Sequence, residues 1–167
     1  FVVLCICTGC RKEAANEMQD NTEKQDMSES QSSVCDNSIK VAEIYRDIYE
    51  RAVEENALDI LEIEEEIINC LGSAGYVAVD GENQIDMVHY ERVIKFCESA
   101  RNGENAEIDI VSLLSFDGFV HYYLNAAKGE IKVTLVTVRW EEGFPEVTYY
   151  HEFSAYTWKY TDGGYLF

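Results

Sequence analysis

The sequence predicts an α+β fold, in which about three helices precede an antiparallel meander sheet and cover one of its faces. Apolar residues recur at helical spacing in the first part of residues 38–167. From Ala106 onward, apolar and polar residues alternate instead, which is typical of half-buried strands. Tight-turn signals such as Asp117-Gly118 separate the alternating segments, so consecutive strands are expected to pair with one another.

Two helices are expected at the start of the folded part. The first covers Ser38–Glu55 and is capped by the hydroxyl of its first residue. The second begins at Asp59, because Glu62 three residues later completes a capping-box pattern, and it ends at Gly72 or Gly75. The residues of the two apolar faces are Val41, Ile44, Tyr45, Ile48 and Ala52 in the first helix and Ile60, Leu61, Ile63, Ile67, Ile68 and Leu71 in the second.

Two acidic segments suggest calcium binding but fit a simpler interpretation. Residues 62–66 place glutamates in the first turns of a helix, where the positive end of the helix dipole stabilises them. The segment DGENQID at 80–86 follows a short strand at 76–79, and its glycine stands second, whereas an EF-hand loop keeps glycine for the sixth position. We therefore expect a turn at 80–83, and Asp86 as the N-cap of a third helix that ends near Ala100.

The alternating segments define the rest of the sheet. Because the sequence stops within a strand, we expect the natural chain to continue past Phe167. Strands are expected at 108–116, 120–124, 131–140 and 147–153, with turns at Asp117-Gly118, Lys128-Gly129 and Glu141-Glu142-Gly143, and a last hairpin is expected from Tyr156–Tyr160 through 162–164 to Tyr165–Phe167.

The first ten residues, FVVLCICTGC, predict the end of a bacterial lipoprotein signal peptide. The tetrad Cys7-Thr8-Gly9-Cys10 matches the lipobox in its two small residues and its final cysteine, while Cys7 stands where leucine is commoner. Cys10 is therefore the expected lipidation site, and a diacylglyceryl group on its thiol would anchor the protein to the membrane. A basic start and an initiator Met are missing, which indicates truncation at the N-terminus.

A buried strand or a clipped transmembrane helix is the alternative interpretation of this run, although a spanning helix needs about 20 apolar residues. Residues 11–37 are rich in Glu, Asp, Gln, Asn and Ser, and we expect them to form a disordered tether. A solvated helix through Glu13–Met18 would only shorten it. The expected location is the cell membrane, with the domain at residues 38–167 held outside the cytoplasm.

The chain is strongly acidic, with a formal net charge of −19. From Ser38 onward it carries 10 Lys and Arg against 25 Asp and Glu, so the expected domain alone has a charge of −15. Such a surface repels phosphate backbones and anionic lipid head groups. The sequence therefore argues against nucleic acid as a partner and leaves the lipid as the membrane contact.

The cysteines do not form an evident disulfide framework. Cys5 and Cys7 lie in the signal segment, and Cys35 lies in the expected tether. Cys70 and Cys97 fall on apolar helix faces, where buried thiols are favoured over a bridge between the two. No Cys and His spacing of the zinc kind occurs, and the sequence indicates no metal and no cofactor.

The remaining motifs indicate no enzyme class. His89, His121 and His151 belong to no HExxH pattern, and alternation places His151 and Glu152 on opposite faces of a strand. No nucleophile elbow and no phosphate-binding glycine loop is present. An enzyme assembled from residues distant in the sequence stays open.

Aromatic residues crowd the C-terminal strands and offer the best candidate surface. Alternation places some of them on the sheet face away from the helices, where they could stack on sugar rings or on a peptide. The alternative is that they fill the core or contact a segment beyond Phe167. The candidate binding residues are Tyr150, Tyr156 and Trp158.

Four segments carry a resemblance to a known family: AEIYRDIYE (Ala42–Glu50), GYVAVDGENQIDM (Gly75–Met87), FCE (Phe96–Glu98) and YTDGGYLF (Tyr160–Phe167). With the lipobox, they resemble a family of uncharacterised lipoproteins of anaerobic Gram-positive gut bacteria that carries a domain of unknown function. The resemblance implies anchoring outside the cytoplasm and members that continue past the GYLF-like strand. It implies no catalytic residue.

The sequence thus favours a lipid-anchored, extracytoplasmic binding or interaction module whose protein, peptide or glycan ligand is unknown. The alternatives are an extracytoplasmic hydrolase whose active site is completed by a missing C-terminal portion, and a purely structural envelope protein.

Overall fold

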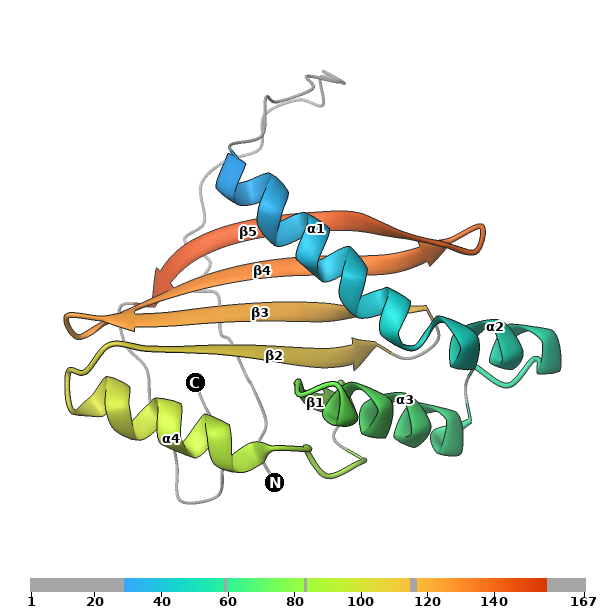
Figure 1. Cartoon of the computed structure of the whole chain (residues 1–167), viewed down its shortest axis with the longest axis horizontal. Coiled ribbons are helices and arrows are strands. Elements are labelled where there is room, and N and C mark those ends of the chain that lie inside the picture. Colours follow the sequence, from blue (N-terminus) through green and yellow to red (C-terminus); the bar gives the residue numbers. More distant parts are fainter. Residues whose placement is uncertain (1–28, 59, 83, 115–116, 156–167) are drawn as a thin grey trace, which may run out of the picture.

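The computed structural model describes residues 29–58, 60–82, 84–114 and 117–155 of the 167-residue chain. Helices precede most of the sheet, so the predicted α+β class is confirmed (Figure 1). The helices are α1 (Glu29–Ile44), α2 (Arg46–Glu55), α3 (Leu61–Ser73) and α4 (Tyr90–Arg101); the strands are β1 (Val77–Asp80), β2 (Ala106–Leu114), β3 (Gly118–Ala127), β4 (Glu130–Glu141) and β5 (Phe144–Ala155).

The five strands form one sheet in the order β1-β2-β3-β4-β5. Strands β2 to β5 pair antiparallel with their sequence neighbours, which confirms the predicted meander. Two of its turns have both central residues in the left-handed region: Lys128 and Gly129 at φ 55° and 83°, and Glu142 and Gly143 at φ 52° and 84°. This geometry matches the twist of the flanking strands, so these turns set the register of β3, β4 and β5.

The sheet is mixed, because β1 pairs parallel with β2. Two parallel neighbours need a connection that crosses a face of the sheet, and α4 lies in that connection. The expectation that helices cover only one face is therefore wrong. Residues of α1 and α3 form a core with one face of β2–β4, whereas residues of α4 form a second core with the other face.

The first helix begins at Glu29, so the boundary expected between tether and domain at residue 37 is wrong. Cys35 and Ser38 are buried on the same helix face as Val41 and Ala42, and burial of this face against the sheet outweighs the polar composition of the segment. Ser38 is thus an interior helix residue and not a cap. The signal segment and residues 11–28 lie outside the described part of the chain.

The expected helix over Ser38–Glu55 is interrupted at Tyr45, which has φ −113° and ψ 17°. The Tyr45 side chain is only 2% exposed, and its ring contacts Phe119 and Trp140 edge-on at centroid distances of 6.3 and 6.0 Å. The Trp140 Nε1–H donates to the Tyr45 hydroxyl over 3.2 Å. These contacts hold the residue between α1 and α2.

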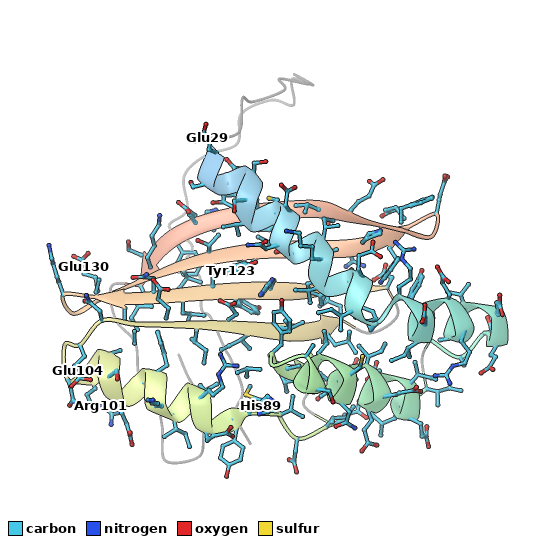
Figure 2. All side chains as sticks on the ribbon, viewed as in Figure 1. Glu29, His89, Arg101, Glu104, Tyr123 and Glu130 are labelled. Carbon is cyan, nitrogen blue, oxygen red and sulfur yellow. The ribbon has the colours of Figure 1, made fainter. Side chains whose placement is uncertain are left out.

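The start of α4 also differs from the prediction, because Asp86 does not cap it. The Asp80 carboxylate instead accepts hydrogen bonds from the backbone N–H groups of Gln84 and Ile85, over 2.7 and 2.9 Å. The chain then has no helical turn as far as Val88, which forms an isolated bridge with Ala78. The helix begins only after His89, which takes a left-handed conformation at its N-cap (Figure 2).

Candidate functional site

The expected binding residues fall in different places. Cys10, Tyr156 and Trp158 lie outside the described residues. Tyr150 of β5 is half-buried and packs against the core on the face covered by α1 and α3, whereas Tyr149 is 53% exposed. The side chain predicted for binding is therefore the more covered of the two, and a binding surface of Tyr150, Tyr156 and Trp158 stays a prediction.

The cysteines of the described residues are free, so Cys70 and Cys97 form no bridge, as the sequence favours; Cys97 is buried, whereas Cys70 is half-buried. Burial raises the pKa of the Cys97 thiol to about 11, which makes the reactive thiolate scarce. The half-buried Cys70 Sγ donates to the Ile44 carbonyl over 3.5 Å. These two cysteines serve packing.

His121 and Ser38 form a pair that sequence reasoning missed, because the two residues are far apart in the chain. The Ser38 Oγ lies 3.2 Å from His121 Nδ1 and 3.3 Å from the Tyr123 hydroxyl. Tyr123, labelled in Figure 2, packs against the core on the face of β3 that α1 covers. Burial lowers the pKa of His121 to about 3, so the imidazole is neutral at ordinary pH. Its Nε2 has no partner within the described residues.

This pair has the side chains of a nucleophile and a base, but solvent and substrates have no access to it. Ser38 is 0% exposed and His121 is 1% exposed, and the rings of Tyr76, Phe119 and Tyr123 contact the imidazole. A substrate cannot reach a hydroxyl in this position without unpacking α1 from the sheet. We therefore assign the pair to the core.

The other two histidines are exposed and separate from each other. His89 Nε2 lies 2.9 Å from the Gly72 carbonyl oxygen, and His151 stacks on Phe153 at a centroid distance of 5.6 Å. His151 pairs with Leu135 and Glu152 with Thr134, so the two side chains point to opposite sheet faces, as predicted. No group of three metal-ligating side chains occurs among the described residues.

A cavity lies where α2 and α3 meet the end of β2 and the start of β3. Its volume is about 20 Å³, which suits one water-sized group. Its lining combines apolar side chains with aromatic residues and the acidic residues Glu64 and Asp117. The lining residues are Tyr45, Tyr49, Leu58, Glu64, Ile67, Leu113, Leu114, Asp117, Gly118 and Trp140.

The aromatic wall of this cavity is rigid. Tyr49 stacks on Trp140 at a centroid distance of 4.2 Å with the ring planes 10° apart. The Arg46 guanidinium carbon lies 4.9 Å from the Trp140 ring centroid, which is cation–π distance. Arg46 is held there by ion pairs with Glu43 and Glu50, at 2.6 and 3.3 Å. The Trp140 ring therefore already faces one cation in the folded protein.

Two titratable side chains that line the cavity have raised pKa values. Burial raises the pKa of Glu64, and the charges of Asp80 and Glu82 add to the shift. Burial likewise raises the pKa of Tyr49, with contributions from Asp117 and Glu141. Both shifts favour the protonated, uncharged form, as expected for groups that are partly withdrawn from water.

Among the described residues that line the cavity there is no histidine, cysteine or serine. Asp117 is paired with Arg139, whereas no ion pair of Glu64 is formed within the described residues. Chemically, this arrangement offers carboxylate and phenol oxygens beside aromatic rings that pack on one another. We take it as the candidate site.

No helix in the described part of the chain is long and apolar enough to span a bilayer. No match was found among curated proteins or among solved structures. A family model, described as a family of unknown function (DUF6070), matches residues 31–167. The match starts two residues after α1 begins and includes all later helices and strands, so the chain belongs to the DUF6070 family of unknown function.

Proposed function

We propose that this protein is a lipid-anchored module outside the cytoplasm that binds a ligand through its α+β domain. In this proposal a diacylglyceryl group on Cys10 is the anchor. The apolar run at residues 1–7 and the Thr8-Gly9-Cys10 sequence that follows it support this assignment. Residues 11–28 separate this cysteine from α1. As a flexible chain they would reach roughly 25 Å, which gives the domain room to clear the lipid head groups.

The observation that favours binding over catalysis is the composition of the cavity wall. It combines Tyr45, Tyr49 and Trp140 with Glu64 and Asp117, and no nucleophile–base pair occurs among the lining residues that the structure describes. The one Ser–His contact of the described residues is sealed in the core.

The anchor can be tested by expressing the chain in a bacterium with a complete signal sequence upstream. We expect mass spectrometry to find a diacylglyceryl adduct on Cys10, and fractionation to place the protein in the membrane. Cys10→Ser should release it, whereas Cys5→Ser, in the same apolar run, should not. A membrane-free product with an unmodified Cys10 thiol would refute the anchor.

The binding role needs a separate assay, because anchoring and recognition can fail independently. Cells that display the protein would be compared with cells that display a Glu64→Gln variant, which changes a half-buried lining residue, for retention of peptides and glycans. Retention that is lost in the variant supports a binding module. Turnover of a bound ligand by the unmodified protein would instead favour the extracytoplasmic hydrolase.

A further inference from the structure

We propose that the domain forms a symmetric dimer, in which β5 pairs antiparallel with β5 of a second copy and the two His151 residues lie at the centre. The two five-stranded sheets would then form one continuous sheet. The stretch that pairs on each side of the axis is Tyr149–Phe153, which lies in regular register with β4. This association goes beyond the proposed binding function and needs neither the lipid anchor nor a ligand.

Within the described part of the chain, β5 is an edge strand that pairs with β4 alone. An edge strand leaves one row of backbone N–H and C=O groups open to pairing with another chain. Pro145 and an irregular register before Tyr149 interrupt only its first half. From Tyr149 onward, β5 contains no proline, lysine or arginine, and its one charged residue, Glu152, forms an ion pair with Lys132 at 3.0 Å. This half of the strand therefore lacks the usual protection against pairing.

The register of the sheet determines which backbone groups of β5 face the open edge. The Lys128-Gly129 turn has two residues, so Ala127 and Glu130 beside it form a hydrogen-bonded pair. Glu130 and every second residue after it therefore bond to β3, while the residues between them, including Leu135, bond to β5. Because Leu135 lies opposite His151, the backbone groups of His151 face β4. Those of its two neighbours face the open edge.

Charge and strand regularity select the centre of the pairing. Residues that face the open edge must bond to residues of the second copy that also face it, which allows an axis at Tyr150, His151 or Glu152. An axis at Glu152 would set two carboxylates directly opposite each other, which is destabilising. An axis at Tyr150 would bring the irregular residues before Tyr149 into the pairing. The axis at His151 avoids both costs.

The residues around His151 are complementary to their own copy. Tyr149 of one chain would lie opposite Phe153 of the other, so two aromatic pairs would flank the two imidazoles on one face. These rings already lie beside the imidazole within one chain, at centroid distances of 6.1 and 5.6 Å. On the other face, Tyr150 would lie opposite Glu152, so no two like charges meet. A two-fold interface requires such self-complementarity, and opposing side-chain pairs of this kind stabilise neighbouring strands.

This stretch is also where two acidic domains can approach each other. Tyr149 is 53% exposed, and His151 is exposed. The β4 residues beside the row of Tyr149, His151 and Phe153 are all uncharged: Thr137, Leu135 and Val133. Elsewhere the excess of carboxylates opposes association of two copies.

The expected dimer keeps both α1 helices on one side. Residues that lie opposite each other in paired strands point to the same sheet face, so the two-fold axis is perpendicular to the sheet. α1 packs on the face that carries Tyr150 and crosses the sheet there (Figure 1). Both helices would therefore lie on the same face of the continuous sheet, which suits two anchors in one membrane.

The test is disulfide formation by the full chain under mild oxidation, with mass spectrometry of the linked peptides. His151→Cys places two thiols on the axis, where the Cα atoms of a non-hydrogen-bonded pair are about 4.5 Å apart, within disulfide range. Tyr149→Cys is the matched control on the same face, because its two copies would lie about 13 Å apart along the strands. We expect the 151–151 link to form at least roughly tenfold faster than the 149–149 link. Equal rates, or no link in either variant, would overturn the proposal.

Charge at the same position gives a second readout that needs no disulfide. Sedimentation velocity should show a concentration-dependent dimer of the unmodified chain. His151→Glu and His151→Lys each set like charges opposite each other, so each should raise the dissociation constant roughly tenfold or more. An equal mixture of the two variants should restore association, because only a residue that faces its own copy can be complemented in this way. A mixture that associates no better than either variant alone would refute the axis at His151.

Failure of this inference is separable from failure of the proposed function. A chain that stays monomeric at every concentration but still retains a peptide or glycan removes the dimer and leaves the binding module. Amide hydrogen exchange of Tyr150 and Glu152 identifies the reason. Slow exchange at both in a monomeric chain would show that another segment of the same chain occupies the edge, which also overturns the dimer.

Discussion

Acidification should weaken the fold through His121. The pKa of this imidazole is lowered from 6.5 to about 3 by burial, so the unfolded chain binds a proton in a pH range where the folded protein does not. Below the unfolded pKa, every step down in pH therefore favours the unfolded state. Between pH 7 and pH 5 this single group should lower the free energy of unfolding by about 2 kcal/mol.

This magnitude does not depend closely on the folded pKa. At pH 5 the folded imidazole is almost entirely neutral for any pKa near 3, so the unfolded pKa alone sets the slope. Only below about pH 3 should the loss level off, at roughly 5 kcal/mol. Glu64 and Asp109, whose pKa values are raised by burial, contribute slopes of the opposite sign.

The assay is urea unfolding at pH 7, 6 and 5, followed by tryptophan fluorescence. His121→Asn removes the titrating group and keeps a polar atom near Ser38, whereas His151→Asn removes an exposed imidazole from β5. Between pH 7 and pH 5, the free energy of unfolding of the His121 variant should fall by about 2 kcal/mol less than that of the wild type. This difference is expected even if the variant is less stable at pH 7. If both variants keep the wild-type slope, His121 is not buried as a neutral group and the reasoning is refuted.

Two further predictions concern the core. Gly118→Ala should lower the free energy of unfolding by about 3 kcal/mol, because the added Cβ would collide with the Val138 carbonyl group of β4. Urea unfolding of the variant and the wild type measures this difference. A loss below about 0.5 kcal/mol would show that the pairing of β3 with β4 relaxes freely around the new methyl group. The Cys97 thiol should react with a thiol reagent far more slowly in the folded protein than in urea, because it is 1% exposed and burial raises its pKa to about 11. Mass spectrometry of the labelled peptides measures both rates. Equal rates would contradict the burial of Cys97.

Local patterns determined much of the architecture. Helical spacing in Val41–Ala52 and Ile60–Leu71, followed by alternation from Ala106, predicted the class and the order of the elements. The Lys128-Gly129 and Glu142-Gly143 turns predicted the hairpins because their left-handed geometry is a property of a few adjacent residues. These features need no information from distant parts of the chain.

The candidate site could not be read in the same way. Its rings and carboxylates come from α2, α3, the start of β3 and the end of β4, so only the folded chain brings them together. The sequence signals available were an aromatic-rich chain and an acidic run at 62–66, and neither distinguishes Glu64 from Glu65. Burial alone makes that distinction.

The sequence by itself determined that this chain is an acidic α+β domain with a meander, since periodicity and turn chemistry act over short distances. Only the tertiary structure decided that α1 starts at Glu29, that β1 runs parallel to β2, and that α4 covers the second face. The physical reason is common to all three. Each depends on apolar surface buried against a distant segment, which local composition does not record.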